Sequence, residues 1–258
     1  MNPRPSNPLM TPLLLILLLV PVALALIYFN LATEAFHRLG LSPGSASLLV
    51  FASLFGGMIN IPLNRRKIVL ADPRATQLPR TMRWLLPVVH YYPPIVTEEV
   101  LAINAGGAIV PIVFSAYLIS LKTTSIPAAI LAVLIVAAVA KLFARPQAKV
   151  GVTLPAFIAP LVAAISAHVL VRLIGADLSS APPVAYIGGT LGTLIGADLL
   201  NLPRILRGEL IGDASSGAQY LGEASDGTPA SNTIIVSIGG AGVFDGIFLT
   251  GILAPLIA

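Results

Sequence analysis

"SIGGAGVFDGIFLTG", residues 237–251, decides the fold, because this stretch is apolar enough for lipid and still carries a carboxylate, Asp245. Three glycines, Gly239, Gly240 and Gly242, precede the acid, and Gly246 follows it. Glycine leaves the backbone free to leave regular structure, and acids inside a membrane are costly and usually functional. The stretch therefore predicts a membrane-embedded helix with a break near its start and a functional acid beside the break.

The composition of the whole chain also predicts a membrane protein. Of its 258 residues, 56% are hydrophobic and 10% are charged, whereas soluble domains carry about 25% charged residues. An apolar run of about 20 residues is long enough to cross a bilayer. We therefore expect a single all-helical domain, residues 1–258, with about seven transmembrane helices at 10–30, 45–63, 98–121, 126–144, 153–175, 183–202 and 233–258.

The first apolar run also has a feature of a secretory signal, since residues 23–25 read "ALA". Its apolar part is longer than the roughly 7–15 residues of a signal, so we expect a retained helix. The chain has no cysteine, which excludes disulfides, thiolate catalysis and cysteine metal sites.

The fifteen Lys and Arg residues predict the orientation of the chain. With the N-terminus inside, twelve of them fall on the cytoplasmic side and three, Arg38, Lys122 and Arg172, fall outside. Positive residues favour the cytoplasmic side of a membrane. We expect a multi-pass protein of the prokaryotic inner membrane with its C-terminus outside. The net charge of +4 then reports topology, and no nucleic-acid partner is expected.

Two connections, 64–97 and 203–232, are long and are expected in the cytoplasm. The first mixes basic and aromatic residues, which fits a segment on lipid headgroups or a gate. The second is polar and is followed by "TIIVSI", residues 233–238, a β-branched run typical of a strand. Together with "AQYLGEA", residues 218–224, this run predicts a short cytoplasmic β-hairpin before the last helix.

A strand at 233–238 implies that the last helix begins late. If it begins after Gly242, residues 243–258 still span about 24 Å, and Asp245 lies in the first turn, where the helix dipole favours a carboxylate. A second expectation concerns span six. Its glycines Gly188, Gly192 and Gly196 lie four apart on one helical face, so another helix can pack closely there.

Asp198, near the cytoplasmic end of span six, is the natural partner of Asp245. Two carboxylates held close titrate as a unit, and one can act as a base toward water while the other donates a proton. The alternative is that each acid bonds its local backbone, Asp245 accepting from the glycine-rich turn. The residues expected to support the pair are Gly196, Gly239, Gly240, Gly242, Gly246, Asn104, Glu99 and Asn201.

Other polar residues receive simpler interpretations. Glu98 and Glu99 are expected to open the third span as helix-start acids, and Asn104 lies a turn or more deeper. His168 and Arg172 face the outer half of span five, and Lys141 lies near the inner end of span four. All three are expected to point outward. Neither a metal nor a cofactor is expected.

Three segments resemble one known family. They are "INAGGAIVP" (103–111), "APPVAYIGGTLGTLIGADLLNL" (181–202) and "SIGGAGVFDGIFLTGILA" (237–254). They are similar to a group of prokaryotic polytopic membrane proteins catalogued as domain of unknown function 1614. The resemblance covers most of the chain beyond the first span and implies a membrane fold without implying a reaction.

A fainter similarity of site is to the intramembrane aspartyl proteases of the presenilin and signal-peptide-peptidase type. Their motifs are Tyr-Asp, then Gly-x-Gly-Asp. Phe244-Asp245 resembles the first motif and Gly196-Ala197-Asp198 resembles the second in part, in reversed order along the chain.

These observations give a leading function and two alternatives. The leading hypothesis is an intramembrane aspartyl protease, with Asp198 and Asp245 as catalytic residues and a membrane protein or peptide as substrate. The first alternative is a proton- or cation-coupled transporter that uses the same acids, and the second is a non-catalytic accessory subunit. The lipid bilayer is the partner common to all three, and the oligomeric state is open.

Overall fold

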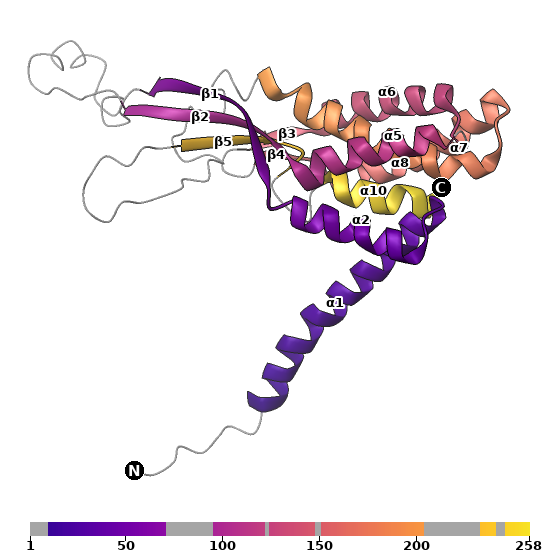
Figure 1. Cartoon of the computed structure of the whole chain (residues 1–258), viewed down its shortest axis with the longest axis horizontal. Helices are drawn as coiled ribbons and strands as arrows, with labels where there is room; N and C mark the ends of the chain where they lie inside the picture. Colours follow the sequence, from indigo (N-terminus) through magenta and orange to yellow (C-terminus); the bar gives the residue numbers. More distant parts are fainter. Residues whose placement is uncertain (1–9, 71–94, 122–123, 148–150, 204–232, 241–245) are drawn as a thin grey trace, which may run out of the picture.

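The computed structural model describes residues 10–70, 95–121, 124–147, 151–203, 233–240 and 246–258. These residues form a bundle of helices with a narrow β-sheet that extends from one end (Figure 1). The described part contains seven α-helices: α1 Met10–Arg38, α2 Pro43–Gly56, α5 Val110–Ser120, α6 Ile126–Phe143, α7 Ile158–Ile174, α8 Ala181–Thr193 and α10 Gly246–Ile257.

Three short helices of other types complete the bundle. Two are π-helices, in which the backbone bonds run between residues five apart: η2 Ala105–Ile109, which leads into α5, and η4 Leu194–Leu199, which continues α8. The third is the 3₁₀-helix η3 Leu178–Ser180, which is capped by Asp177. A backbone N–H of Ser179 and its side chain hold the pKa of the exposed Asp177 carboxyl below its usual value.

The sheet has the strand order β1–β2–β5. Strand β1 (Asn60–Leu70) pairs antiparallel with β2 (Ile95–Asn104), and β5 (Thr233–Ile238) pairs parallel with β2. Two further strands, β3 (Arg145–Gln147) and β4 (Gly151–Thr153), form a separate antiparallel pair.

The sheet corrects several predicted boundaries. The second predicted span ends as a helix at Gly56, because β1 begins at Asn60, and the third is helical only from Ala105. Glu98 and Glu99 therefore lie in β2 and do not open a helix. Apolarity alone located these segments, and apolarity does not separate a helix from an extended run.

The prediction for the last segment is confirmed in its main point. Residues 233–238 form a strand, and the last helix begins late, at Gly246. The described partner of β5 is β2, in parallel, so the sheet is mixed. The other expected half of the hairpin, residues 218–224, lies outside the described residues.

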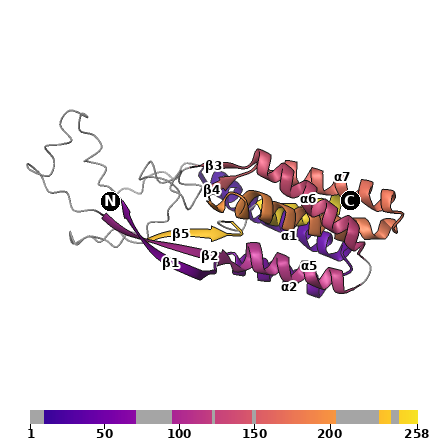
Figure 2. The same cartoon turned by 90° about the horizontal axis from the view of Figure 1, so that it is seen from above.

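The helices run alternately in opposite directions along the bundle (Figures 1 and 2). We call the end that carries the sheet the sheet end and the opposite end the distal end. Helix α1 runs parallel to α10, since the Tyr28 ring lies 6.0 Å from the Phe248 ring and Arg38 reaches the far end of α10. The connection from α1 to α2 therefore lies at the distal end, as does the end of α10.

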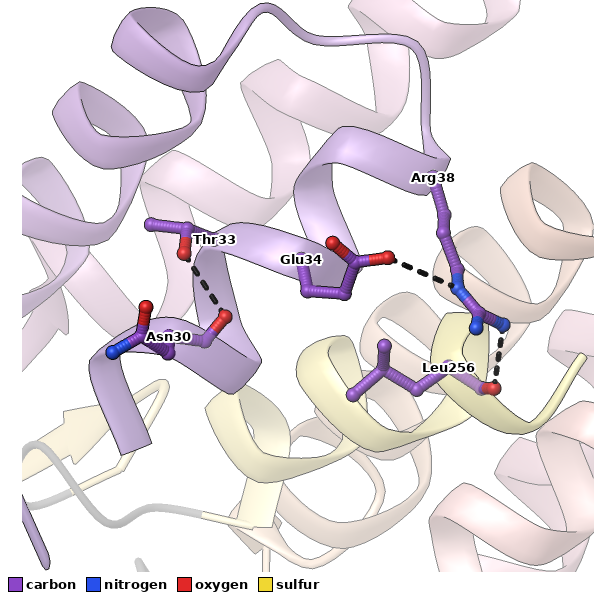
Figure 3. Close-up of polar contacts among 5 residues, drawn as sticks. All are labelled: Asn30, Thr33, Glu34, Arg38 and Leu256. Carbon is purple, nitrogen blue, oxygen red and sulfur yellow. Dashed lines mark hydrogen bonds and ion pairs between the residues drawn. The ribbon is translucent and has the colours of Figure 1, made fainter. Parts of the chain in front are cut away.

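Arg38 anchors α1 at the distal end (Figure 3). Its Nη1 donates a hydrogen bond of 2.9 Å to the carbonyl of Leu256, and its Nε lies 3.7 Å from the Glu34 carboxylate. One turn earlier, the Thr33 hydroxyl donates to the carbonyl of Asn30 at 2.9 Å. Most of α1 beyond these contacts is exposed and diverges from the bundle (Figure 1).

Small residues bring the helices of the core together. A Cβ on Gly188 would lie 2.6 Å from Ala132 Cβ, and a Cβ on Gly192 would lie 2.6 Å from Val136 Cβ. The same face continues to Gly196, where a Cβ would lie 2.3 Å from the carbonyl oxygen of Ala137. The predicted close packing along this glycine face is therefore confirmed, and its partner is α6.

Two described helices are long and apolar enough to cross a membrane, namely residues 17–38 of α1 and helix α6. Four others are apolar but shorter: residues 43–56, 105–120, 158–174 and 246–257.

Candidate functional site

A glycine pair follows each of the strands β2 and β5 at the sheet end of the bundle. Ile103 of β2 lies beside Ile238 of β5, so Gly106-Gly107 and Gly239-Gly240 follow neighbouring parallel strands. We call this place, residues 104–108, 196–201 and 237–240, the sheet–bundle junction. The two glycine pairs thus occupy corresponding places, each shortly after the end of its strand.

The two glycine segments touch through their backbones. A Cβ on Gly107 would lie only 1.8 Å from the carbonyl oxygen of Gly239, and a Cβ on Gly239 would lie 2.6 Å from Ala108 Cβ. Gly239 and Gly240 also have φ angles of 94° and 85°, in the left-handed region that favours glycine. At this contact any side chain on Gly107 or Gly239 would push the two segments apart.

Asn104 joins the strands to the first helix of the junction. Its side chain is 1% exposed. Its Nδ2 donates to the carbonyl of Gly57 at 2.7 Å and to Asn60 Oδ1 at 3.1 Å, and its Oδ1 accepts the N–H of Gly107 at 2.8 Å. Asn104 therefore caps η2 and fills its own bonding capacity, which is a structural role at the junction.

Ser237 and Glu99 occupy different places on the sheet. The Ser237 hydroxyl donates to Asn60 Oδ1 at 2.6 Å, which ties β5 to the same amide group that Asn104 holds. Glu99 lies five residues before Asn104 along β2, opposite Arg66, and is therefore about 17 Å from the junction by strand rise. The predicted support of Asp198 by Glu99 stays a prediction.

Asp198 is the carboxylate of the junction. It lies in the π-helix η4, half-buried, and its Oδ2 accepts the backbone N–H of Gly239 at 2.7 Å. Asp198, from another helix, is thus an acceptor for the glycine-rich turn, and the predicted acceptor role of Asp245 stays a prediction because Asp245 lies outside the described residues. The bond between Asp198 and Gly239 joins the turn that follows β5 to the π-helix that follows α8.

Lys141 reaches the same turn from α6. Its Nζ donates to the carbonyl of Leu200 at 2.5 Å and to Asn201 Oδ1 at 2.6 Å. Lys141, expected to point outward, is half-buried at the sheet end and turns toward η4, where its bond to Leu200 lies at an exposed site. The only signal in the sequence was a lysine in an otherwise apolar helix, and that pattern is also typical of an outward-pointing residue.

Asn201 completes the polar contacts of η4. It is fully buried, and its Nδ2 donates to the carbonyls of Ala197 at 2.8 Å and Gly196 at 3.4 Å. A π-helix shifts the backbone bonding pattern by one residue, which leaves carbonyls to be satisfied by side chains. Asn201 and Lys141 together supply those donors, so they hold the turn that carries Asp198.

The remaining predicted site residues are placed only in part. Asp245 and Gly242 lie outside the described residues, so the distance between the two acids stays a prediction. Gly246 begins α10, and a Cβ on it would meet nothing within 4 Å, so its missing side chain is not required for packing. Within the described ranges no group of three His, Asp or Glu side chains could hold a metal ion.

Three buried polar atoms in the helices have no hydrogen-bond partner among the described residues. They are Ser115 Oγ, His168 Nδ1 and Thr193 Oγ1. The buried Nδ1 shows that one side of the His168 ring faces the interior, which corrects the prediction that His168 points outward. Arg172, in the last turn of α7, is exposed as predicted.

The fold and the junction define a helical bundle in which two strand–glycine–helix units meet beside one carboxylate. Residues 54–257 match the model of the family described as "Protein of unknown function (DUF1614)", and the chain belongs to this family. No curated protein and no solved structure matches the chain. The similarity to aspartyl proteases gains no support from these comparisons.

Proposed function

We propose that this protein spans the membrane several times and moves a proton or a monovalent cation across it, with Asp198 as the residue that carries the charge. The observation that supports the proposal is the placement of opposite charges. Asp198 lies in the π-helix η4, and the ammonium of Lys141 bonds the carbonyl of Leu200, the residue that directly follows η4. Both charges therefore lie at the same end of an apolar bundle. Ionisable groups in such a setting are costly and mark ion or proton pathways.

The distribution of apolar residues supports a bundle surrounded by lipid. More than half of the buried hydrophobic residues in the described part are alanine, and many large apolar residues, mainly Leu, Ile, Val and Phe, are exposed. Soluble proteins rarely expose such continuous apolar surface, and small residues at helix contacts are typical of membrane bundles. The four shorter apolar helices belong to the same bundle as the two long ones.

The proposed topology places the sheet end in the cytoplasm and the distal end outside. Because the chain contains no cysteine, a single introduced cysteine can be labelled without background from native thiols, and its labelling reports the side of the membrane on which it lies. We expect Ser179→Cys, at the distal end beside η3, to react with an impermeant maleimide in intact cells. Ser215→Cys, in the connection before β5, should react only after the cells are permeabilised. Equal labelling of both positions in intact cells would exclude this arrangement.

The transport proposal rests on Asp198 alone, since Asp245, the predicted second acid of a hydrolase, lies outside the described residues. An aspartyl hydrolase needs a second carboxylate close to the first, and the described residues of the junction contain none besides Asp198. Discontinuous helices that meet unwound backbone around a buried charge are a recurring arrangement in transporters. The junction has part of that character, since η4 interrupts regular helix after α8 and η2 lies between β2 and α5.

Ion flux in liposomes tests this function. The wild-type protein is expected to dissipate an imposed sodium or proton gradient, and Asp198→Asn is expected to reduce the flux at least about tenfold, since a neutral amide cannot carry the charge. The amide oxygen can still accept the Gly239 N–H, so the variant should fold. Absence of flux with cleavage of a membrane peptide, lost in both Asp198→Asn and Asp245→Asn, would establish the hydrolase instead.

A further inference from the structure

We propose that the hydroxyl of Thr193 is a second ligand beside Asp198, and that the two bind a monovalent cation such as Na⁺. This inference rests on the proposed function and names its substrate class. It begins from Thr193 Oγ1, a buried oxygen that no described residue bonds, in a side chain that is only 2% exposed. An unpaired hydroxyl in an apolar interior costs free energy, so its retention calls for a partner.

Two neighbouring threonines show that the missing bond is specific to Thr193. Thr190 on α8 and Thr250 on α10 are each 1% exposed. The Thr190 hydroxyl donates to the carbonyl of Tyr186 at 2.8 Å, and the Thr250 hydroxyl donates to the carbonyl of Gly246 at 2.5 Å. Both use the carbonyl four residues back along their own helix, whereas Thr193 leaves its hydroxyl available for another group.

The π-helix η4 brings Thr193 and Asp198 to one face. In an α-helix, residues five apart point about 140° away from each other. In a π-helix the backbone bond joins residues five apart, so they lie above one another. Thr193 immediately precedes η4, and within it the N–H of Leu200 donates to the carbonyl of Ile195, five residues back, at 2.9 Å. The hydroxyl therefore lies one turn above the carboxylate, toward the distal end.

The charge of the site favours a monovalent ion. Hard cations take carboxylate and neutral oxygen ligands, which Asp198 and Thr193 supply with a single negative charge between them. Lys141 adds a positive charge at the same turn, where it bonds Leu200 and Asn201. A divalent ion would be repelled by this ammonium twice as strongly as Na⁺, and the residues of the sheet–bundle junction contain no carboxylate besides Asp198 to offset it.

Thermal unfolding of the purified full chain in detergent tests the assignment. NaCl is exchanged for choline chloride at constant ionic strength, so that only the sodium concentration changes. A ligand that binds the folded state raises the unfolding temperature with its concentration. We expect Thr193→Val to shift the sodium dependence to about tenfold higher concentration, and Thr193→Ser to restore it. Thr190→Val and Thr250→Val are the matched controls and should leave it unchanged.

The outcomes separate this inference from the function on which it rests. If Thr193→Val and Thr193→Ala respond to sodium as the wild type does, while Asp198→Asn loses the response, Thr193 is no ligand and the function stands. If the wild type shows no response to Na⁺, Li⁺ or K⁺, the cation assignment is overturned. Proton flux that Asp198→Asn abolishes would then still support the function, and absence of any flux would reject it.

Discussion

Gly107→Ala is expected to prevent the sheet from docking on the bundle and to leave little folded protein. The new methyl carbon would lie 1.8 Å from the carbonyl oxygen of Gly239, and both partners of this clash are backbone. Overpacking in a well-packed core usually costs about 1–3 kcal/mol, and more where the backbone must move. We expect a loss of at least about 3 kcal/mol, seen as a strongly lowered unfolding temperature and a poor yield of monodisperse protein.

Gly246→Ala provides the matched control for this prediction. Gly246 begins helix α10, and a Cβ there would meet nothing within 4 Å. Alanine also favours the helix more than glycine does, by about 1 kcal/mol, so the control should be neutral or slightly stabilised. An unfolding temperature of Gly107→Ala equal to that of Gly246→Ala would contradict the backbone contact between the two glycine segments.

Lys141→Met is expected to destabilise the protein by about 1–3 kcal/mol, because it leaves the oxygen of the buried Asn201 side chain without its donor. The methionine keeps the length and the apolar part of the side chain but loses the bonds to Leu200 and Asn201. A buried acceptor without its donor costs its full desolvation penalty. The measurement is thermal unfolding of the purified variant, combined with the flux assay.

Arg145→Met serves as the control for the loss of a positive charge at the same end of the bundle. The Arg145 side chain is exposed in β3, and surface charges of this kind contribute little to stability. The control is therefore expected to unfold within about 0.5 kcal/mol of the wild type. A Lys141→Met variant that is equally stable would mean that Lys141 does not hold the π-turn.

The helical bundle could largely be predicted from the sequence. The run at 126–144 coincides with α6 within one residue, because an apolar segment of this length exceeds the usual length of a strand. The glycine spacing of α8 predicted its contact face, since small residues four apart permit only close packing. The "TIIVSI" strand and the late start of α10 followed from β-branching and from the glycines between them.

The sheet and the details of the junction could not be predicted in the same way. β2 reads "IVTEEVLAIN", whose apolar residues also fit a helix start, and only its long-range pairing with β1 and β5 decides the structure. The course of the Lys141 side chain toward the turn after α8 depends on η4, and a π-turn leaves no simple signal in one sequence. The same turn hides the relation between Thr193 and Asp198, because helical periodicity places them on different faces.

The most direct test of this account is the charge that moves when sodium is added rapidly to membranes holding the reconstituted protein. We predict a transient current in the wild type that grows with the sodium concentration and is absent in Asp198→Asn. A proton-only protein would instead give a current with a pH jump, again absent in the variant. A folded wild-type protein that gives no current with either ion, or a current that Asp198→Asn leaves unchanged, would contradict the claim that Asp198 carries charge through the membrane.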